Sequence, residues 1–392
     1  MTTSLSTEED ILQAGVVRLG ELLGEGWEVA PVHMAAPVGG NTVAGTNAHV
    51  DMVWMVRHTS WGGGHGQVLV EAVGDLSPAR AETILADRAQ LMRQLMGQVA
   101  VLVLAPWLSP RTRAVLERRG FGYLDLTGNI SFHLALPPVH IATAGAQRNP
   151  VPSPHTHRGL SGAKAGRLVR VLVDFEPPYT ARELARVAGI SEGYVSRLLD
   201  AMTDEALITR DGRDIVDVDW VGLLEARSRS YRVLRANLVV PAVARRGRSH
   251  VLDALATPVM EGRAFLTGSV AAQAIAPVTV GGQLMLYVQP GPHEIDDVAA
   301  DLGLLRSVEP VEASDGVLLL QTHNHGPLDR PAALEGTPMV QRVGLSQLVL
   351  DCLGGPGRMP AEGEALLQHM RDTVGFWRQP HLPEPAPETM TR

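Results

Sequence analysis

The stretch YTARELARVAGISEGYVSRLLDAMTDEALITRDGRDIVDVDW, residues 179–220, decides how the middle of this chain folds. Thr180 and Glu183 have the spacing of a capping box, in which the two side chains satisfy free backbone groups at the start of a helix. Gly189 can end that helix because glycine adopts a left-handed conformation without strain. The sequence therefore predicts a short, capped helix at the start of this stretch.

A second helix and a hairpin follow. Ser191 predicts the N-cap of the second helix, and apolar residues then recur at helical period to about Glu205. Polar and apolar residues alternate on both sides of Asp211-Gly212, a pair typical of tight hairpin turns. Helix, turn, helix and hairpin in this order make a winged helix-turn-helix. Its expected core residues are Ala185, Val187, Ile190, Val195, Leu198, Leu199 and Met202.

The exposed N-terminal half of the second helix is placed to enter the major groove of double-stranded DNA. Residues at the start of the first helix and on the hairpin are placed for phosphates or the minor groove. The alternative is a helix pair that serves packing or protein contacts. The pattern resembles bacterial winged-helix transcriptional regulators. The predicted DNA-binding residues are Thr180, Arg182, Ser191, Glu192, Tyr194, Ser196, Arg197, Arg210 and Arg213.

Charge is distributed unevenly along the 392 residues. The formal net charge is −8, which argues against a protein that coats nucleic acid without specificity. From Lys164 to Arg248, however, 15 basic residues stand against 12 acidic ones. An acidic body around a mildly basic centre favours a sequence-specific regulator over a scaffold. Lys164 is the only lysine among the 34 basic residues, which is typical of a GC-rich genome.

Cysteine, histidine and leader patterns exclude several classes of protein. Cys352 is the only cysteine, so neither an intrachain disulfide nor a cysteine-based zinc site is expected. The pairs His155/His157 and His323/His325 have no third ligand nearby, so no bound metal and no cofactor are expected. The N-terminus is acidic and unlike a signal peptide. No apolar run reaches membrane-spanning length, so we expect a cytoplasmic protein without membrane partners.

Turn signals and composition shifts predict an α/β multidomain protein. The first part alternates helix and strand, as in a small α/β layer with a partly parallel sheet. A stretch dense in Pro, Gly, Ser and Asn predicts a linker, and a Pro- and Glu-rich end predicts disorder. The predicted segments are an α/β domain at 1–148, a linker at 149–162, the winged helix at 163–235, a second α/β domain at 236–378 and a disordered tail at 379–392.

Two acidic positions lie on neighbouring predicted strands of the first domain. Asp51 begins the strand DMVWMV, and Glu71 lies in the next strand, LVEAV. This arrangement resembles the restriction-endonuclease-like family, whose Asp and Glu-x-Lys bind magnesium and activate water. Val73 stands where that family places lysine, so the ammonium that would stabilise the attacking hydroxide is missing. We expect a retained fold without catalysis, with vestigial Asp51, Glu71 and Val73; the alternative is that the two acids have only structural roles.

A basic helix follows in LAPWLSPRTRAVLERRGFGYLDLTGNI, residues 104–130. This segment resembles a recurrent part of actinobacterial regulators with the same domain order. Its arginines are expected on a solvated helix face and not at a phosphate site: Arg111, Arg113, Arg118 and Arg119.

The second α/β domain contains a Gly-Ser turn. Gly268 and Ser269 precede an alanine-rich helix, and the turn resembles that of the nucleotidyltransferase fold, where a helix N-terminus holds triphosphate. That chemistry also needs two carboxylates on the next strand, but residues 284–288 contain none, and Asp296 and Asp297 come later. Gly268 and Ser269 are therefore candidates for binding a small ligand without catalysis. The alternative is a plain strand-to-helix turn.

The domain order also resembles antitoxin-type regulators of abortive-infection systems. The leading hypothesis is a sequence-specific transcriptional regulator, not an enzyme, that reads two half-sites as a homodimer. The segment VGLLEARSRSYRVLRA, residues 221–236, is one candidate for the dimer contact. The flanking domains would serve assembly, DNA contact or ligand sensing, which leaves a small-molecule or protein effector open. The alternatives are a divergent metal-dependent nuclease targeted by the winged helix and an antitoxin-type protein that binds a partner toxin.

Overall fold

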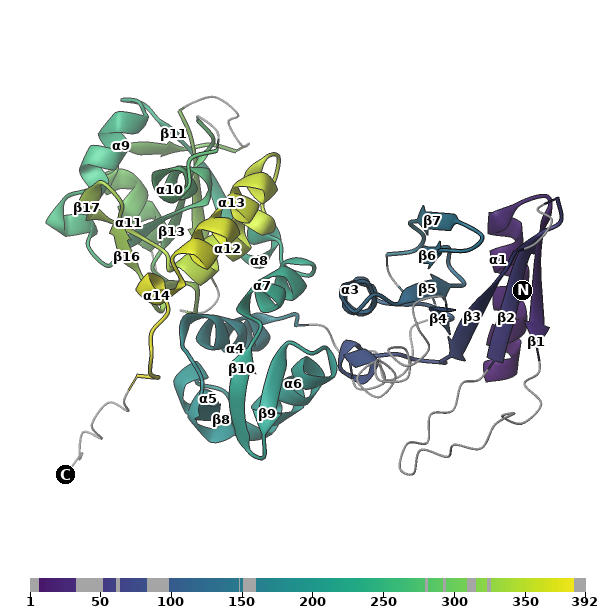
Figure 1. Ribbon diagram of the computed structural model, residues 1–392. Helices are drawn as coiled ribbons and strands as arrows, with labels where there is room; N and C mark the ends of the chain where they lie inside the picture. Colours follow the sequence, from purple (N-terminus) through teal and green to yellow (C-terminus); the bar gives the residue numbers. More distant parts are fainter. Residues whose placement is uncertain are drawn as a thin grey trace. The chain divides into compact units, whose positions relative to one another are not determined.

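The computed structural model describes residues 7–32, 52–60, 64–82, 99–147, 149–150, 160–278, 281–291, 294–308, 315–322 and 326–383. Asp51, the two histidine pairs and most of the predicted linker lie outside these ranges. The chain divides into two compact units, residues 1–156 with 204–206 and residues 157–203 with 207–392. Both units are mixed α/β structures with a seven-stranded sheet (Figure 1).

The sheet of the N-terminal unit has its strands in sequence order. Strands β3, β4 and β5 run parallel, and every other neighbouring pair is antiparallel. The unit's elements are α1 (Glu8–Leu23), β1 (Trp27–Val32), β2 (Met52–His58), β3 (His65–Ala72), β4 (Val99–Ala105), α3 (Pro110–Arg118), β5 (Gly122–Asp125), β6 (Ile130–Leu134) and β7 (Val139–Thr143).

A separate hydrophobic cluster covers each side of this sheet. Helix α1 buries Ile11 and Leu19 against strand residues that include Trp54, whereas α3 buries Leu116 in the second cluster. Helix α1 approaches β4 closely at Gly15, where a Cβ atom would lie 2.6 Å from the Leu104 side chain. The apolar periods of helix and strand therefore fix the two layers around the sheet.

A buried polar network holds the turn between β5 and β6. The Asp125 carboxylate, fully buried, accepts hydrogen bonds from the backbone of Leu108 at 3.1 Å and of Thr127 at 2.9 Å. The Asn129 amide donates to Asp125 at 2.8 Å and to the Ala146 carbonyl at 3.0 Å. The network satisfies a buried carboxylate and closes the turn.

Arg113 corrects the prediction that the arginines of α3 are solvated. Its side chain is 9% exposed, and it donates to Asn129 Oδ1 at 2.6 Å and to Gln147 Oε1 at 2.9 Å. Arg118 and Arg119 are exposed, as expected. Arg113 is buried because α3 turns it toward the β5–β6 turn, and the sequence period alone did not reveal that partner.

We predict that Asn129→Ala destabilises the N-terminal unit by about 2–4 kcal/mol, because it leaves Asp125 and Arg113 short of buried partners. Hydrogen exchange of peptides covering β5 to β7 measures the loss of protection. Arg118→Ala, which removes an exposed charge from α3, the helix that carries Arg113, is the control. Equal protection in both variants would contradict the role of the network.

The C-terminal unit begins with helices and a small three-stranded antiparallel sheet of order β8-β10-β9. The predicted capping box is present, with the Glu183 backbone donating to Thr180 Oγ1 and the Thr180 backbone to Glu183 Oε2. Gly189 ends the first helix at a φ of 61°, in the left-handed region. The elements are α4 (Ala163–Asp174), β8 (Tyr179–Thr180), α5 (Ala181–Ala188), α6 (Glu192–Asp204), β9 (Ile208–Asp211) and β10 (Asp214–Val218).

The rest of this unit surrounds a seven-stranded mixed sheet of order β14-β11-β15-β13-β12-β17-β16. Its central strands β13 and β15 are parallel and carry continuous buried apolar runs. Helices α10, α12 and α13 pack together beside it. The elements are α7 (Trp220–Ser228), α8 (Val233–Ala236), β11 (Leu238–Ala244), α9 (Arg248–Leu255), η1 (Pro258–Met260), β12 (Ala264–Thr267), α10 (Gly268–Ile275), β13 (Leu284–Val288), α11 (Glu294–Asp301), β14 (Leu304–Arg306), β15 (Gly316–Gln321), η2 (Gly326–Leu328), β16 (Ala332–Leu334), β17 (Thr337–Arg342), α12 (Leu345–Leu353), α13 (Met359–Asp372) and α14 (Val374–Trp377).

A shared hydrophobic core and an ion pair connect α4 to the part of the unit that contains the seven-stranded sheet. One hydrophobic cluster extends from Leu160 to Met370. Arg330 lies 3.1 Å from the carboxylate of Asp174 and stacks over the Phe175 ring at 4.2 Å. Burial raises the pKa of Asp174, while the Arg330 charge opposes that rise. The helices at 163–235 and the sheet at 236–378 therefore form one body.

The end of the chain also contacts this body. The backbone of Gln379 donates to the Asp174 carbonyl and accepts from Glu176, each at 2.8 Å. Arg186 donates to the Pro383 carbonyl at 3.2 Å. Within the tail at 379–392 that the sequence predicts to be disordered, Gln379 and Pro383 therefore contact this body, and residues 384–392 lie outside the described part.

The segment at 221–236, expected to be one helix, is two. Helix α7 ends at Ser228 and α8 begins at Val233, and between them Tyr231 turns inward and is 8% exposed. Helix α7 packs against α4 and α12, and Trp220 meets Trp377 edge-on at 5.1 Å. The apolar face of α7 is therefore covered within the unit, and the dimer contact along this segment stays a prediction.

Candidate functional site

Helix α6 presents a polar face opposite its packed side. Val195, Leu198, Leu199 and Met202 are buried in the core, as the sequence predicted. The backbone carbonyl of Ser191 accepts from Tyr194 at 3.0 Å, which begins the helix. The remaining predicted contact residues at this end are either exposed or half-buried: Ser191, Glu192 and Arg197 are exposed, and Tyr194 and Ser196 are half-buried.

Two cations from different helices flank the Tyr194 ring. Lys164, at the start of α4, places Nζ 5.7 Å from the ring centroid, and the Arg197 guanidinium lies 5.9 Å from it. Arg197 also donates to the Gly193 carbonyl at 3.1 Å, so its side chain lies along the exposed face. Lys164 was not among the site residues predicted from the sequence, where it stood out only as the single lysine of the chain.

The hairpin differs from α6 in charge. Arg210 forms an ion pair with Asp200 of α6 at 3.0 Å, which fastens the hairpin to the helix, and its contact with phosphate stays a prediction. Arg213 is exposed at the turn. Its neighbours Asp211 and Asp214 are exposed as well, so the tip carries more acid than base.

The two predicted contact residues at the start of α5 differ: Thr180 has a structural role, and Arg182 lies at the surface. The Thr180 hydroxyl donates to Glu183 at 2.8 Å within the capping box, so its side chain is engaged. Hydrogen bonds from the Thr180 backbone and hydroxyl lower the pKa of Glu183. Arg182 is exposed and projects from the first turn of α5. Of the predicted contact residues outside α6, Arg182 and Arg213 are therefore the accessible cations.

The residues predicted from the nuclease-like pattern lie in the N-terminal unit. Glu71 is half-buried on β3, and its strand neighbour across the parallel pair is Val103. Val73 is 4% exposed just after β3, where its backbone donates to Leu104. Asp51 lies outside the described residues. Within the described residues, no three His, Cys, Asp or Glu side chains are grouped as a metal site requires.

The Gly-Ser turn is closed in by neighbouring side chains. Ser269 is 4% exposed, and a Cβ atom at Gly282 would lie 2.6 Å from its Cβ. Gly268 adopts a φ of 67°, and a Cβ atom there would lie 2.9 Å from Met285 Sδ. The turn therefore has the packing of a tight strand-to-helix connection, and a different part of the unit contains the cavity.

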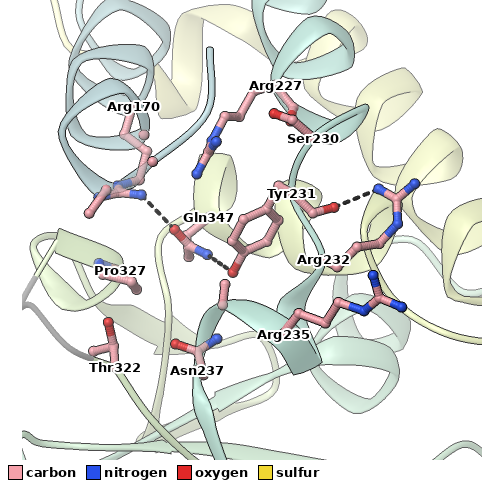
Figure 2. A pocket seen from close by; sticks show the side chains of 14 residues that line it. Arg170, Arg227, Ser230, Tyr231, Arg232, Arg235, Asn237, Thr322, Pro327 and Gln347 are labelled. Atoms are coloured by element: carbon pink, nitrogen blue, oxygen red, sulfur yellow. Dashed lines mark hydrogen bonds between the residues drawn. The ribbon is translucent and has the colours of Figure 1, made fainter. Parts of the chain in front are cut away.

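That cavity has a volume of about 440 Å³ and is lined by arginines (Figure 2). Arg170 of α4 donates to Gln347 Oε1 at 2.9 Å, and Arg227 of α7 lies 5.2 Å from the Tyr231 ring centroid. Arg232 donates to the carbonyls of Ser228 and Tyr231. The other residues that line the cavity are Gly162, Ala163, Gly166, Ser230, Arg235, Ala236, Asn237, Thr322 and Pro327.

A buried hydrogen-bond network forms the floor beneath these arginines. The Asp351 carboxylate accepts from Tyr231 at 2.7 Å and from Gln347 at 2.8 Å. Its second oxygen accepts from the Thr267 hydroxyl at 2.7 Å. Burial raises the pKa of Asp351 to about 6, although each of these donors lowers it. The floor therefore holds a carboxyl group that titrates near pH 6.

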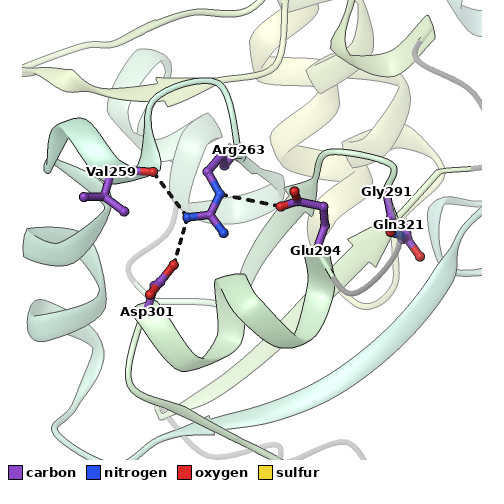
Figure 3. A network of polar contacts seen from close by, with 6 residues as sticks. All are labelled: Val259, Arg263, Gly291, Glu294, Asp301 and Gln321. Carbon is purple, nitrogen blue, oxygen red and sulfur yellow. Dashed lines mark hydrogen bonds and ion pairs between the residues drawn. The ribbon is translucent and has the colours of Figure 1, made fainter.

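Another arginine of the same unit shows the more usual arrangement (Figure 3). Arg263 lies 2.8 Å from Asp301 and 3.5 Å from Glu294, at the two ends of α11, and its Nη1 is 3.5 Å from the Val259 carbonyl. The hydrogen bond that Arg263 donates to Asp301 raises its pKa. This side chain ties α11 to β12 and contacts two carboxylates, whereas no carboxylate is among the residues that line the cavity.

Comparison of the chain with family models, curated proteins and solved structures gave no match. Across the described ranges, no helix combines the length and the apolar character needed to cross a bilayer.

We predict that Asp351 gives the C-terminal unit a pH-dependent stability. Its pKa rises from 3.8 to about 6 on folding, so the folded state holds the proton more tightly. The free energy of unfolding should therefore fall by about 3 kcal/mol as the pH rises through this window. Urea unfolding at several pH values, followed by Trp220 and Trp377 fluorescence, measures this.

Asp351→Asn should remove that slope, whereas Asp253→Asn, which changes an exposed carboxyl of α9, should keep it. The same pH dependence in both variants and in the parent protein would show that Asp351 does not titrate in this range.

Proposed function

We propose that this protein is a sequence-specific DNA-binding transcriptional regulator that reads the major groove with α6. The supporting observation is the polar face of α6, where Arg197 of the same helix and Lys164 of α4 flank Tyr194. The order of α4, α5, α6 and the β9–β10 hairpin fits a winged helix, and in this arrangement the second helix of the pair enters the groove.

The distribution of charge indicates how such a helix would contact DNA. Lys164 begins α4 and is exposed, so it is placed for a phosphate beside the groove. Arg197 lies on α6 and is placed for a base edge, where arginine pairs with guanine through two hydrogen bonds. The acidic tip at Asp211 and Asp214 repels phosphates, so we assign the hairpin a lesser part than the sequence suggested.

The flanking parts fit a supporting role. The order and directions of β2 to β5 are compatible with the restriction-endonuclease-like fold, and β12, the Gly-Ser turn and β13 with the nucleotidyltransferase-like fold. We propose both as catalytically inactive. The absence of nuclease activity is tested by incubating the protein with plasmid and magnesium or manganese.

We predict that Arg197→Ala weakens binding to the selected site by about 1–3 kcal/mol, or roughly fivefold to 150-fold, because it removes a base contact. Selection from a random DNA library supplies the site, and gel-shift titration supplies the affinities. Lys164→Ala should instead weaken binding to all sequences and reduce the salt slope by about 1.

Arg246→Ala, which removes an exposed charge far from α6 in the sequence, is the control and should bind within twofold of the parent protein. Full affinity in both the Arg197 and Lys164 variants would rule out α6 as the reading helix. Loss of affinity in the control as well would indicate general charge attraction in place of a defined surface.

We further propose a homodimer, because a single α6 offers few base contacts to a chain of net charge −8. A twofold pair would read half-sites about one helical turn apart. Light scattering at micromolar concentration should give twice the mass of 42.0 kDa, and the footprint should be twofold symmetric. A monomer that protects one asymmetric site would exclude this assembly.

A further inference from the structure

The arginine-lined cavity contains an unmatched positive charge. Arg227 is 6% exposed, and its Nε is buried without a hydrogen-bond partner in the described part of the chain. Its Nη1 donates to the Leu160 carbonyl, which is neutral. Arg170 donates to the neutral amide of Gln347, and the more distant charges of Asp329 and Asp174 act on it as well. Burial lowers the pKa of both arginines; the two carboxylates oppose that change at Arg170, whereas no carboxylate of the described residues opposes it at Arg227.

The same unit neutralises other sheltered arginines. Arg263 contacts two carboxylates, Arg330 pairs with Asp174 at 3.1 Å, and Arg342 pairs with Glu335 at 2.6 Å. The cavity, in contrast, has four arginines and no carboxylate among its lining residues. The arrangement is the one expected where an anion from outside the chain supplies the missing charge.

The size and the neutral groups of the cavity narrow the chemistry of that anion. A volume of about 440 Å³ lies in the range of small-molecule sites and exceeds what one inorganic phosphate fills. Guanidinium groups bind phosphate oxygens in pairs and also stack on aromatic rings. The side-chain NH₂ of Asn237 donates to the Val233 carbonyl and to the Tyr287 hydroxyl. Its side-chain oxygen is left to accept a hydrogen bond from a ligand, as far as the described residues show.

We propose that this cavity binds a nucleotide-sized organic polyphosphate, whose phosphates contact Arg170, Arg227 and Arg235. Arg235 is exposed at the rim and is placed to receive the ligand, whereas Arg227 and Arg170 lie deeper beside Tyr231 and Gln347 (Figure 2). Arg232 already donates to two backbone carbonyls, so we expect it to contribute to the positive potential of the cavity more than to contact the phosphates directly.

The position of the cavity also gives the ligand a regulatory effect, a step that rests on the proposed DNA binding. Gly162 and Ala163 line the cavity, and the next residue, Lys164, lies over Tyr194. Phosphates bound at this end of α4 lower the positive potential on which DNA phosphates would depend. The ligand therefore weakens DNA binding, and by linkage DNA weakens ligand binding by the same factor.

Isothermal titration of the full-length protein with ATP, GTP, pyrophosphate and adenosine tests the site without DNA. We expect binding of a nucleoside triphosphate, weaker binding of pyrophosphate and none of adenosine. Arg235→Gln and Arg170→Gln should each weaken triphosphate binding at least fivefold, and Arg246→Gln should leave it within twofold. Thermal unfolding without ligand identifies any variant that fails to fold. Because Arg235 is exposed, its replacement should leave the fold intact, so this variant can decide the test even where the Arg170 variant does not fold.

No heat with any phosphate at millimolar concentration, or equal affinity in the Arg170, Arg235 and Arg246 variants, would overturn the site. Pyrophosphate binding as tight as that of the triphosphates would show that the cavity recognises phosphates alone and would contradict the nucleotide-sized ligand. Gel shifts with and without the triphosphate then test the coupling. If the ligand binds and the affinity for DNA is unchanged, only the regulatory effect is refuted. If the ligand binds to a protein that selects no DNA, the proposed function is refuted and the ligand site in the cavity stands.

Discussion

The hydrogen bond from Tyr231 to the buried carboxyl of Asp351 is the constraint on which the C-terminal unit depends. It pulls the chain inward between α7 and α8, and it joins residues 120 positions apart at 2.7 Å. Gln347 bonds the same Asp351 oxygen and also receives Arg170 from α4. One carboxyl group therefore connects α4, the break after α7 and the helices beside the sheet.

This constraint also explains why the arginines gather in one place. The turn at Tyr231 brings Arg227, from the end of α7, and Arg235, from α8, to the same cavity as Arg170. Asp351 lies beneath Tyr231 and Gln347, so its charge is screened by four donors and does not neutralise the cavity.

Local signals in the sequence were sufficient for most elements and insufficient for the site. The capping box at Thr180, the left-handed Gly189 and the apolar period of α6 are decided within a few residues, so they could be predicted. Arg113 and Tyr231 could not, because their partners lie far along the chain and only packing brings them together. Strands β16 and β17 were missed for a different reason, because their short runs carry only a weak alternation of apolar and polar residues.

The charges around α6 determine what kind of DNA binding is physically reasonable. The Lys164 side chain of α4 places a positive charge beside α6. The hairpin, in contrast, exposes three carboxylates, those of Asp211, Asp214 and Asp217. Phosphate attraction falls with salt and acts at any sequence, while base contacts are short-ranged and specific. With an acidic hairpin and a chain charge of −8, phosphate attraction alone is weak. Under the proposed function, tight binding would then require the correct bases at α6, and the acidic surroundings would suppress attachment to other sequences and so increase selectivity.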